Sequence, residues 1–94
     1  MSSTFRRATR EIRKLWATGD SLVLPHARLR MIERRIDDLD LQNIILKGHV
    51  VEQQLGPRGL IRHRVLGTTV DGAPAWCVVS IEKELLIITV VRPP

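Results

Sequence analysis

The chain is poor in cysteine, in aromatic residues and in long apolar runs, and each shortage excludes a class of protein. Its single cysteine, Cys77, excludes an internal disulfide and a zinc site built from cysteines, and is compatible with a reducing cytosol. The longest apolar run, Leu85–Val91 with Thr89 interrupting it, is far shorter than the roughly 20 residues that span a bilayer. Only 3% of the residues are aromatic. This argues against a sheet that reads RNA by stacking several bases.

Signals for export and for cofactor binding are also missing. The N-terminal segment is rich in arginine and has no apolar stretch of the kind found in secretory signal peptides. The chain has no glycine-rich phosphate loop, no Ser-His-Asp set and no spacing typical of metal ligands. We therefore expect a soluble cytoplasmic protein that has no membrane span and uses no cofactor.

Positive charge is concentrated near the start of the chain. The net charge is +5, and the excess of Lys and Arg lies within residues 1–35, whereas the remainder is nearly neutral. Such asymmetry favours a polyanionic partner, namely RNA or another nucleic acid, a membrane surface, or an acidic protein. The length of 94 residues suits one hydrophobic core. We divide it into a basic amphipathic helical extension over residues 1–20 and a single α+β domain over residues 21–94.

Hydrophobic periodicity predicts three helices followed by four strands. The first helix ends at Gly19, the second runs from Pro25 to Ile36, and the third runs from Asp37 or Asp38 to Lys47. Ser21–Leu24 is expected to be an extended connector. The strands are expected over residues 50–55, 60–69, 75–81 and 85–92, with the last in the interior of the sheet. The predicted fold is α+β, with N-terminal helices packed on one face of a four-stranded antiparallel meander.

The second predicted helix carries the sharpest candidate site. At about 100° per residue, His26, Glu33, Arg30 and Arg34 fall in one sector roughly 100° wide. The like charges at i,i+4 repel one another, and a bound anion would reverse this small cost. The residues expected to point away from this sector, toward the core, are Leu29, Ile32 and Ile36.

The residue types in this sector suit cleavage of RNA without a metal ion. That reaction needs a base, an acid, and cations for the charge that grows on phosphorus. Histidine titrates near neutral pH and arginine binds phosphate bidentately, so we name His26, Arg30 and Arg34 as catalytic candidates. In the alternative, His26 makes a local hydrogen bond and the arginines pair with aspartates nearby. Arginine neighbours favour a structural salt bridge for Glu33 over a role as a base.

A second group of candidates lies on the predicted strands. Alternation places His63 on one strand face and Arg62 and Arg64 on the other. If His63 faces the helices, it is a hydrogen-bonded core histidine; if the arginines do, they join Arg30. The bases of the first helix either contact a membrane surface or an acidic protein, or are solvated. The residues named as nucleic-acid-binding candidates are Arg28, Arg62, His63, Arg64 and Arg92.

Several motifs together resemble a known family. They are His26-Ala27-x-x-Arg30-Met31-x-Glu33-Arg34-x-Ile36, Gly48, Val65-Leu66-Gly67, Asp71-Gly72-x-Pro74 and Ile87-Ile88-Thr89-Val90-x-Arg92-Pro93. From about Leu22 to Pro93 the chain resembles the small bacterial family called domain of unknown function 4258. The resemblance implies a layout similar to RelE-like and ParE-like toxins, with some members encoded beside small zinc-finger proteins in toxin and antitoxin style. Two departures are Arg35, where the family often has glycine, and Val91, where it often has tyrosine; the second argues against chemistry assisted by tyrosine.

Three functions are compatible with these patterns. The leading hypothesis is a toxin-like domain that binds RNA and, in its enzymatic form, is a metal-independent endoribonuclease. The alternative is a non-catalytic basic module that binds an acidic, antitoxin-like protein or a nucleic acid. A third hypothesis is a homodimeric structural protein that associates through a strand edge or through its first helix.

Overall fold

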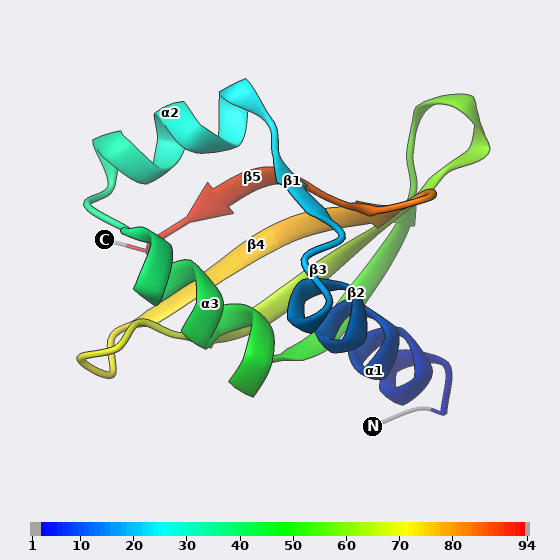
Figure 1. The fold of residues 1–94 in the computed structure, drawn as a ribbon, viewed down its shortest axis with the longest axis horizontal. Coiled ribbons are helices and arrows are strands. Elements are labelled where there is room, and N and C mark those ends of the chain that lie inside the picture. Colours follow the sequence, from blue (N-terminus) through cyan, green and yellow to red (C-terminus); the bar gives the residue numbers. More distant parts are fainter. Residues whose placement is uncertain (1–2, 94) are drawn as a thin grey trace.

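The computed structural model describes residues 3–93 as three helices packed against one face of a five-stranded sheet (Figure 1). The α+β class is therefore confirmed. The elements are α1 (Ser3–Ala17), β1 (Ser21–Val23), α2 (Pro25–Glu33), α3 (Asp38–Lys47), β2 (His49–Leu55), the 3-10 turn η1 (Pro57–Gly59), β3 (Ile61–Thr68), β4 (Pro74–Ile81) and β5 (Leu85–Val91). Within residues 3–93, no helix combines the length and apolar character needed to cross a bilayer.

The sheet contains one strand more than the sequence predicts, and it is mixed. Its order is β1-β5-β4-β3-β2, and β2 to β5 form the expected antiparallel meander. Ser21–Val23, expected to be part of a connector, pairs in parallel with β5, and Leu24 N–H donates to the Ile87 carbonyl at 3.0 Å. The prediction of four antiparallel strands was therefore wrong. Pairing with β1 satisfies backbone groups of β5 that would otherwise form a sheet edge, and it confirms that β5 is an interior strand.

A single apolar layer lies between the helices and the sheet. Val65, Cys77 and Val90 form one row across three neighbouring strands, and each is almost completely buried. From the helices, Ile12 of α1 and Met31 of α2 are both 1% exposed. The α3 side chains that complete the layer are Leu41, Ile44 and Ile45, as the sequence predicts. All three helices therefore contribute to one core.

The inward face of α2 differs from the predicted one. Leu29 and Ile32 are 50% and 70% exposed, whereas Ala27 and Met31, one turn apart, are buried against the sheet. The prediction was wrong for Leu29 and Ile32 because the small side chain of Ala27 allows α2 to approach β5 closely. The helix ends at Glu33, and the residues beyond it turn through a positive φ of 55° at Arg35. Ile36 is buried as predicted.

The ends of the helices explain where the chain turns. Gly19 has a φ of +80°, and Asp20 N–H donates to the Leu15 carbonyl at 2.9 Å, which closes α1 in a Schellman-like turn. At the start of α3, Asp37 accepts a hydrogen bond from Asp40 N–H at 2.8 Å, and the Asp40 side chain accepts one from Asp37 N–H. This reciprocal capping confirms the predicted start of the third helix.

The C-terminal end of α3 lies unusually close to β3. A Cβ atom added to Gly48 would lie 2.3 Å from the Ile44 carbonyl oxygen and 2.5 Å from the Leu66 carbonyl oxygen. Gly67 on β3 is similarly close to Ile44. Glycine at both positions therefore allows helix and strand backbones to approach each other.

The far edge of the sheet is interrupted. β2 pairs with β3 on one side only, and the register shifts between Val50 and Glu52. Val50 pairs with Val65 and Glu52 with Arg64, which leaves Val51 as an additional residue in β2. This arrangement is a β-bulge in an edge strand.

Candidate nucleic-acid interface

The predicted cluster on α2 is organised around one carboxylate. Arg30 Nη1 lies 2.5 Å from Glu33 Oε2, and Arg34 Nη1 lies 3.9 Å from the same oxygen. The side chains of the two arginines are about one-third exposed, at 35% and 33%. The structure thus brings Arg30 and Arg34 together, with Glu33 between them and none of the aspartates involved. The cluster keeps one net positive charge, and a phosphate would compete with Glu33 for both guanidinium groups.

His26 stands apart from this ion pair. It lies in the first turn of α2 and is exposed, and its side chain makes no hydrogen bond or ion pair with any residue from 3 to 93. Arg28 lies on another side of α2, where its Nη1 is 2.6 Å from Asp38 Oδ1. This pair connects α2 to the beginning of α3.

Arg62 and Arg64 lie on the sheet face opposite the helices. The Arg64 guanidinium is 4.4 Å from the centroid of the Trp76 ring and its Nη1 is 3.9 Å from Glu52 Oε1. Stacking of this kind stabilises an arginine over an indole ring. Arg62 lines a separate hollow of about 180 Å³ together with Leu86. The two strand arginines therefore do not join Arg30.

His63 faces the helices, as one of the two predicted arrangements requires. It is 8% exposed, and its Nδ1 lies 3.1 Å from the side-chain nitrogen of Gln53. Because the Gln53 amide donates to Nδ1, the neutral imidazole carries its hydrogen on Nε2. Burial lowers the pKa of His63 below its ordinary value, and the nearby charge of Glu11 opposes this effect. The imidazole is therefore neutral at pH 7.

Arg92 follows β5, and its positive charge influences Asp71 in the β3–β4 turn. The hydrogen bond that Thr69 donates to Asp71 lowers the pKa of that carboxyl, and the charge of Arg92 lowers it further. The eight candidate residues predicted from the sequence therefore lie in several separate places. Among them, Arg30 and Arg34 are brought together because both pair with Glu33.

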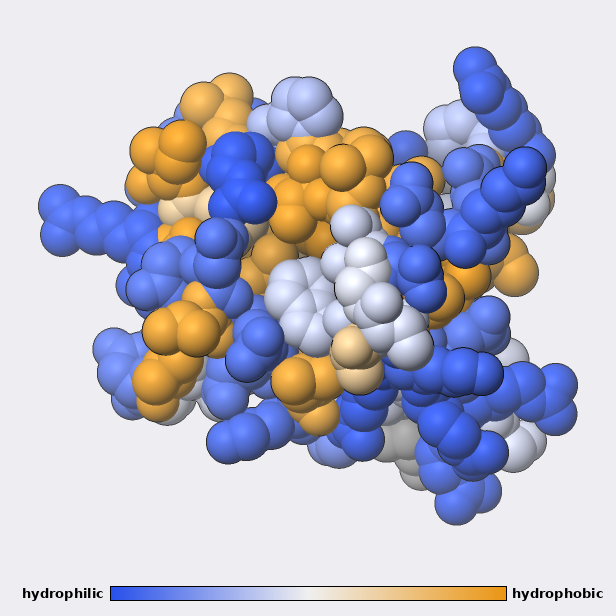
Figure 2. All heavy atoms as spheres, in the orientation of Figure 1, coloured by the Kyte–Doolittle hydropathy of each residue, from blue (hydrophilic) through white to orange (hydrophobic). Residues whose placement is uncertain are grey.

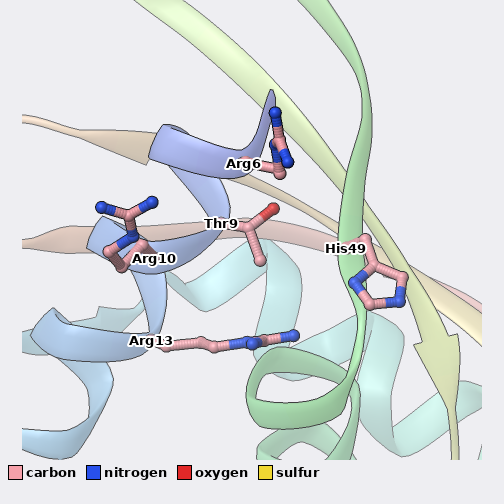
Figure 3. A pocket seen from close by; sticks show the side chains of 5 residues that line it. All are labelled: Arg6, Thr9, Arg10, Arg13 and His49. Atoms are coloured by element: carbon pink, nitrogen blue, oxygen red, sulfur yellow. The ribbon is translucent and has the colours of Figure 1, made fainter. Parts of the chain in front are cut away.

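A further group of basic residues, outside those eight candidates, lines a hollow between α1 and the start of β2. It consists of Arg6, Arg10, Arg13 and His49, which we call the α1 basic surface, and the hollow measures about 350 Å³ (Figure 3). Arg13 extends toward β2, and its Nη2 donates to the Gly48 carbonyl at 2.8 Å. The Arg10 guanidinium lies on the side of α1 away from His49. Hydrophilic atoms gather over α1 in the space-filling view (Figure 2).

No residue of the α1 basic surface has an acidic partner among residues 3–93. Within residues 3–93 the ion pairs involve Arg28, Arg30, Arg34 and Arg64, and none involves a residue of this surface. The Nε of Arg13 is buried and has no hydrogen-bond acceptor among the described residues. The amphipathic pattern of α1 is visible in the sequence, but the position of His49 beside it depends on how α1 packs on β2.

Thr9 fixes α1 at this position. Its hydroxyl donates to the Phe5 carbonyl at 2.8 Å and accepts from Val50 N–H at 3.0 Å. A buried threonine therefore satisfies a backbone donor of the bulged edge strand and holds the helix across it. Sequence reasoning missed this residue because Thr9 interrupts the apolar stripe of α1.

The helical layer, the five-stranded sheet and the exposed guanidinium groups define a small basic α+β domain. The model of the family described as "Domain of unknown function (DUF4258)" matches residues 23–92, so the chain belongs to this family. The match begins at the end of β1 and extends beyond β5, which leaves α1 outside it. Comparison with curated proteins and with solved structures gives no significant match.

Proposed function

We propose that this chain is a toxin-like module that binds RNA through phosphate contacts at the α1 basic surface. The observation that carries the proposal is the absence of acidic partners for Arg6, Arg10 and Arg13 among the described residues. Arginine pairs with phosphate through short, charge-assisted hydrogen bonds.

The composition of the surface favours RNA over an acidic protein. The hollow is lined by three arginines, one threonine and one histidine, with no large apolar or aromatic side chain. Protein interfaces have a buried centre enriched in such side chains, whereas phosphate contacts need cations and hydrogen-bond donors. A surface of this type binds the nucleic-acid backbone without reading its sequence.

The proposal has three finer parts: a RelE-like layout, a bacterial origin and an endoribonuclease activity. The first is supported by the layer of helices on one sheet face and by the family resemblance. The catalytic part rests on His26, whose imidazole is exposed one helical turn before Arg30. Cleavage of a labelled RNA in the presence of a chelator should be lost in His26→Ala and in Arg30→Ala. Equal cleavage in all three proteins would refute a catalytic role for this pair.

RNA binding can be measured by fluorescence anisotropy with a labelled single strand of about 16 nucleotides. If three arginines contact phosphate, the slope of log affinity against log salt is about −2, which predicts a loss of about 20-fold between 50 and 200 mM salt. The double variant R6Q/R10Q should make this slope shallower by about 1.4.

The matched control R58Q/K83Q removes the same charge from exposed sites elsewhere. It should leave the salt slope nearly unchanged. Equal losses in both double variants would show that net charge, and not the α1 basic surface, determines binding. Absence of RNA binding by the wild-type chain at low salt would refute the proposed function.

A further inference from the structure

A second hollow lies on the other flank of α1, between that helix and β3. It measures about 370 Å³, within the range typical of small-molecule sites. Leu60, Ile61 and Ile81 provide apolar walls. The polar side chains include those of Arg7 and Glu11 from α1 and His63 from β3. A hollow with apolar walls and a few polar groups is typical of a small-molecule site.

His63 offers a hydrogen-bond donor to this hollow. Its Nδ1 is occupied by Gln53, so the free hydrogen of the neutral ring is on Nε2. The buried side-chain atoms without a partner, among the described residues, belong to Arg13, Arg34, Arg64 and Arg92. The Nε2 atom of His63 has no hydrogen-bond partner in residues 3–93 and is not one of these buried atoms, so it keeps some accessible surface, and His63 lines the hollow.

Glu11 offers an acceptor of two hydrogen bonds, and Arg7 offers a cation. The two residues are one helical turn apart, and neither forms an ion pair within residues 3–93. Glu11 lies near enough to His63 to act on it electrostatically. The hollow therefore combines a carboxylate that accepts two hydrogen bonds with donors on both α1 and β3.

We propose that this hollow binds guanine, with Glu11 accepting from N1–H and from the N2 amino group while His63 Nε2–H donates to O6. Guanine places two adjacent donors beside its O6 and N7 acceptors. Adenine and cytosine each place an acceptor nitrogen next to their amino group, so a carboxylate facing that edge meets one repulsive partner. Arg7 does not contact the base in this arrangement and is available to bind a phosphate group of the nucleotide. This inference deepens the RNA-binding proposal and rests on it for the source of the base, since guanine also occurs in free nucleotides.

The test compares guanosine, inosine and adenosine monophosphates by calorimetry with the full chain. Guanosine monophosphate should bind. Inosine monophosphate, which lacks the N2 amino group, should bind roughly 10- to 150-fold more weakly, because a hydrogen bond to a charged acceptor contributes about 1.5–3 kcal/mol. Adenosine monophosphate should bind more weakly still. Glu11→Gln should abolish the preference for guanosine, whereas the control Glu84→Gln, in the β4–β5 turn, should retain it.

A second arm uses single-stranded RNA with and without guanine. R6Q/R10Q should weaken binding of both RNAs, whereas Glu11→Gln should weaken binding only of the guanine-containing strand. Circular dichroism confirms that each variant is folded. Preference for guanosine monophosphate without preference in RNA would support the guanine site and assign it to free nucleotides. Equal affinity for the three nucleotides, or no binding of any, would overturn the inference even if RNA binding itself is intact.

Discussion

Replacing Gly48 with alanine should destabilise the chain even though its backbone conformation suits alanine. Gly48 has a φ of −80° and a ψ of 179°. Such a replacement ordinarily stabilises a protein by about 0.4–1 kcal/mol, because the unfolded chain loses freedom. The new Cβ, however, would lie 2.3 Å from the Ile44 carbonyl oxygen and 2.5 Å from that of Leu66. Both obstacles are backbone atoms, so α3 and β3 must separate.

Separation of packed elements by an added methyl group typically costs about 1–3 kcal/mol. This exceeds the gain from the unfolded state, so we expect a net loss of about 1–2 kcal/mol in the free energy of unfolding. Urea denaturation followed by tryptophan fluorescence measures it, with Lys47→Ala, an exposed neighbour, as the control. A Gly48→Ala variant as stable as the wild type, or more stable, would refute the close approach of α3 and β3.

Three further predictions concern single side chains. Asp37→Ala removes the cap of α3 and should lower the free energy of unfolding by about 1 kcal/mol in urea, whereas an unchanged value would mean that the cap does not form in solution. Burial raises the pKa of Cys77 to about 12, so mass spectrometry should detect no alkylation by iodoacetamide at about pH 8 until urea unfolds the chain; rapid alkylation without urea would contradict its burial. Burial lowers the pKa of His63 below 6.5, so the unfolded state takes up its proton first and stability should fall as the pH drops through that value. His63→Gln should lose this part of the pH dependence, and an identical pH profile would argue against a neutral, buried imidazole.

Most of the fold could be predicted from the sequence because its elements carry local signals. The capping residues of α3 and the alternation along β3 define those elements without reference to the rest of the chain. Ser21–Val23 carries no such signal. It becomes a strand only because β5, more than 60 residues later, presents an unpaired edge to it. Pairing of this kind is non-local and depends on the assembled sheet.

The candidate site was less predictable because the spacing of charged residues along the sequence does not determine which of them form ion pairs. Arg30 and Arg34 share a helix sector with Glu33, and the structure shows that both arginines pair with this carboxylate and not with an aspartate. Arg13 and His49 are far apart in the sequence and meet because Thr9 holds α1 on β2. Tertiary packing therefore decides which cations keep a partner and which remain open.

The bulge in β2 has a consequence for self-association. The extra residue Val51 bends β2 and increases its twist, so a second copy that added its own strand to this edge would find a regular run only over residues 52–55 beyond the bulge. At the opposite edge, β1 offers only three residues. Neither border is a good template for a continuous intermolecular sheet, and this protects a chain with strongly apolar strands from polymerising side by side.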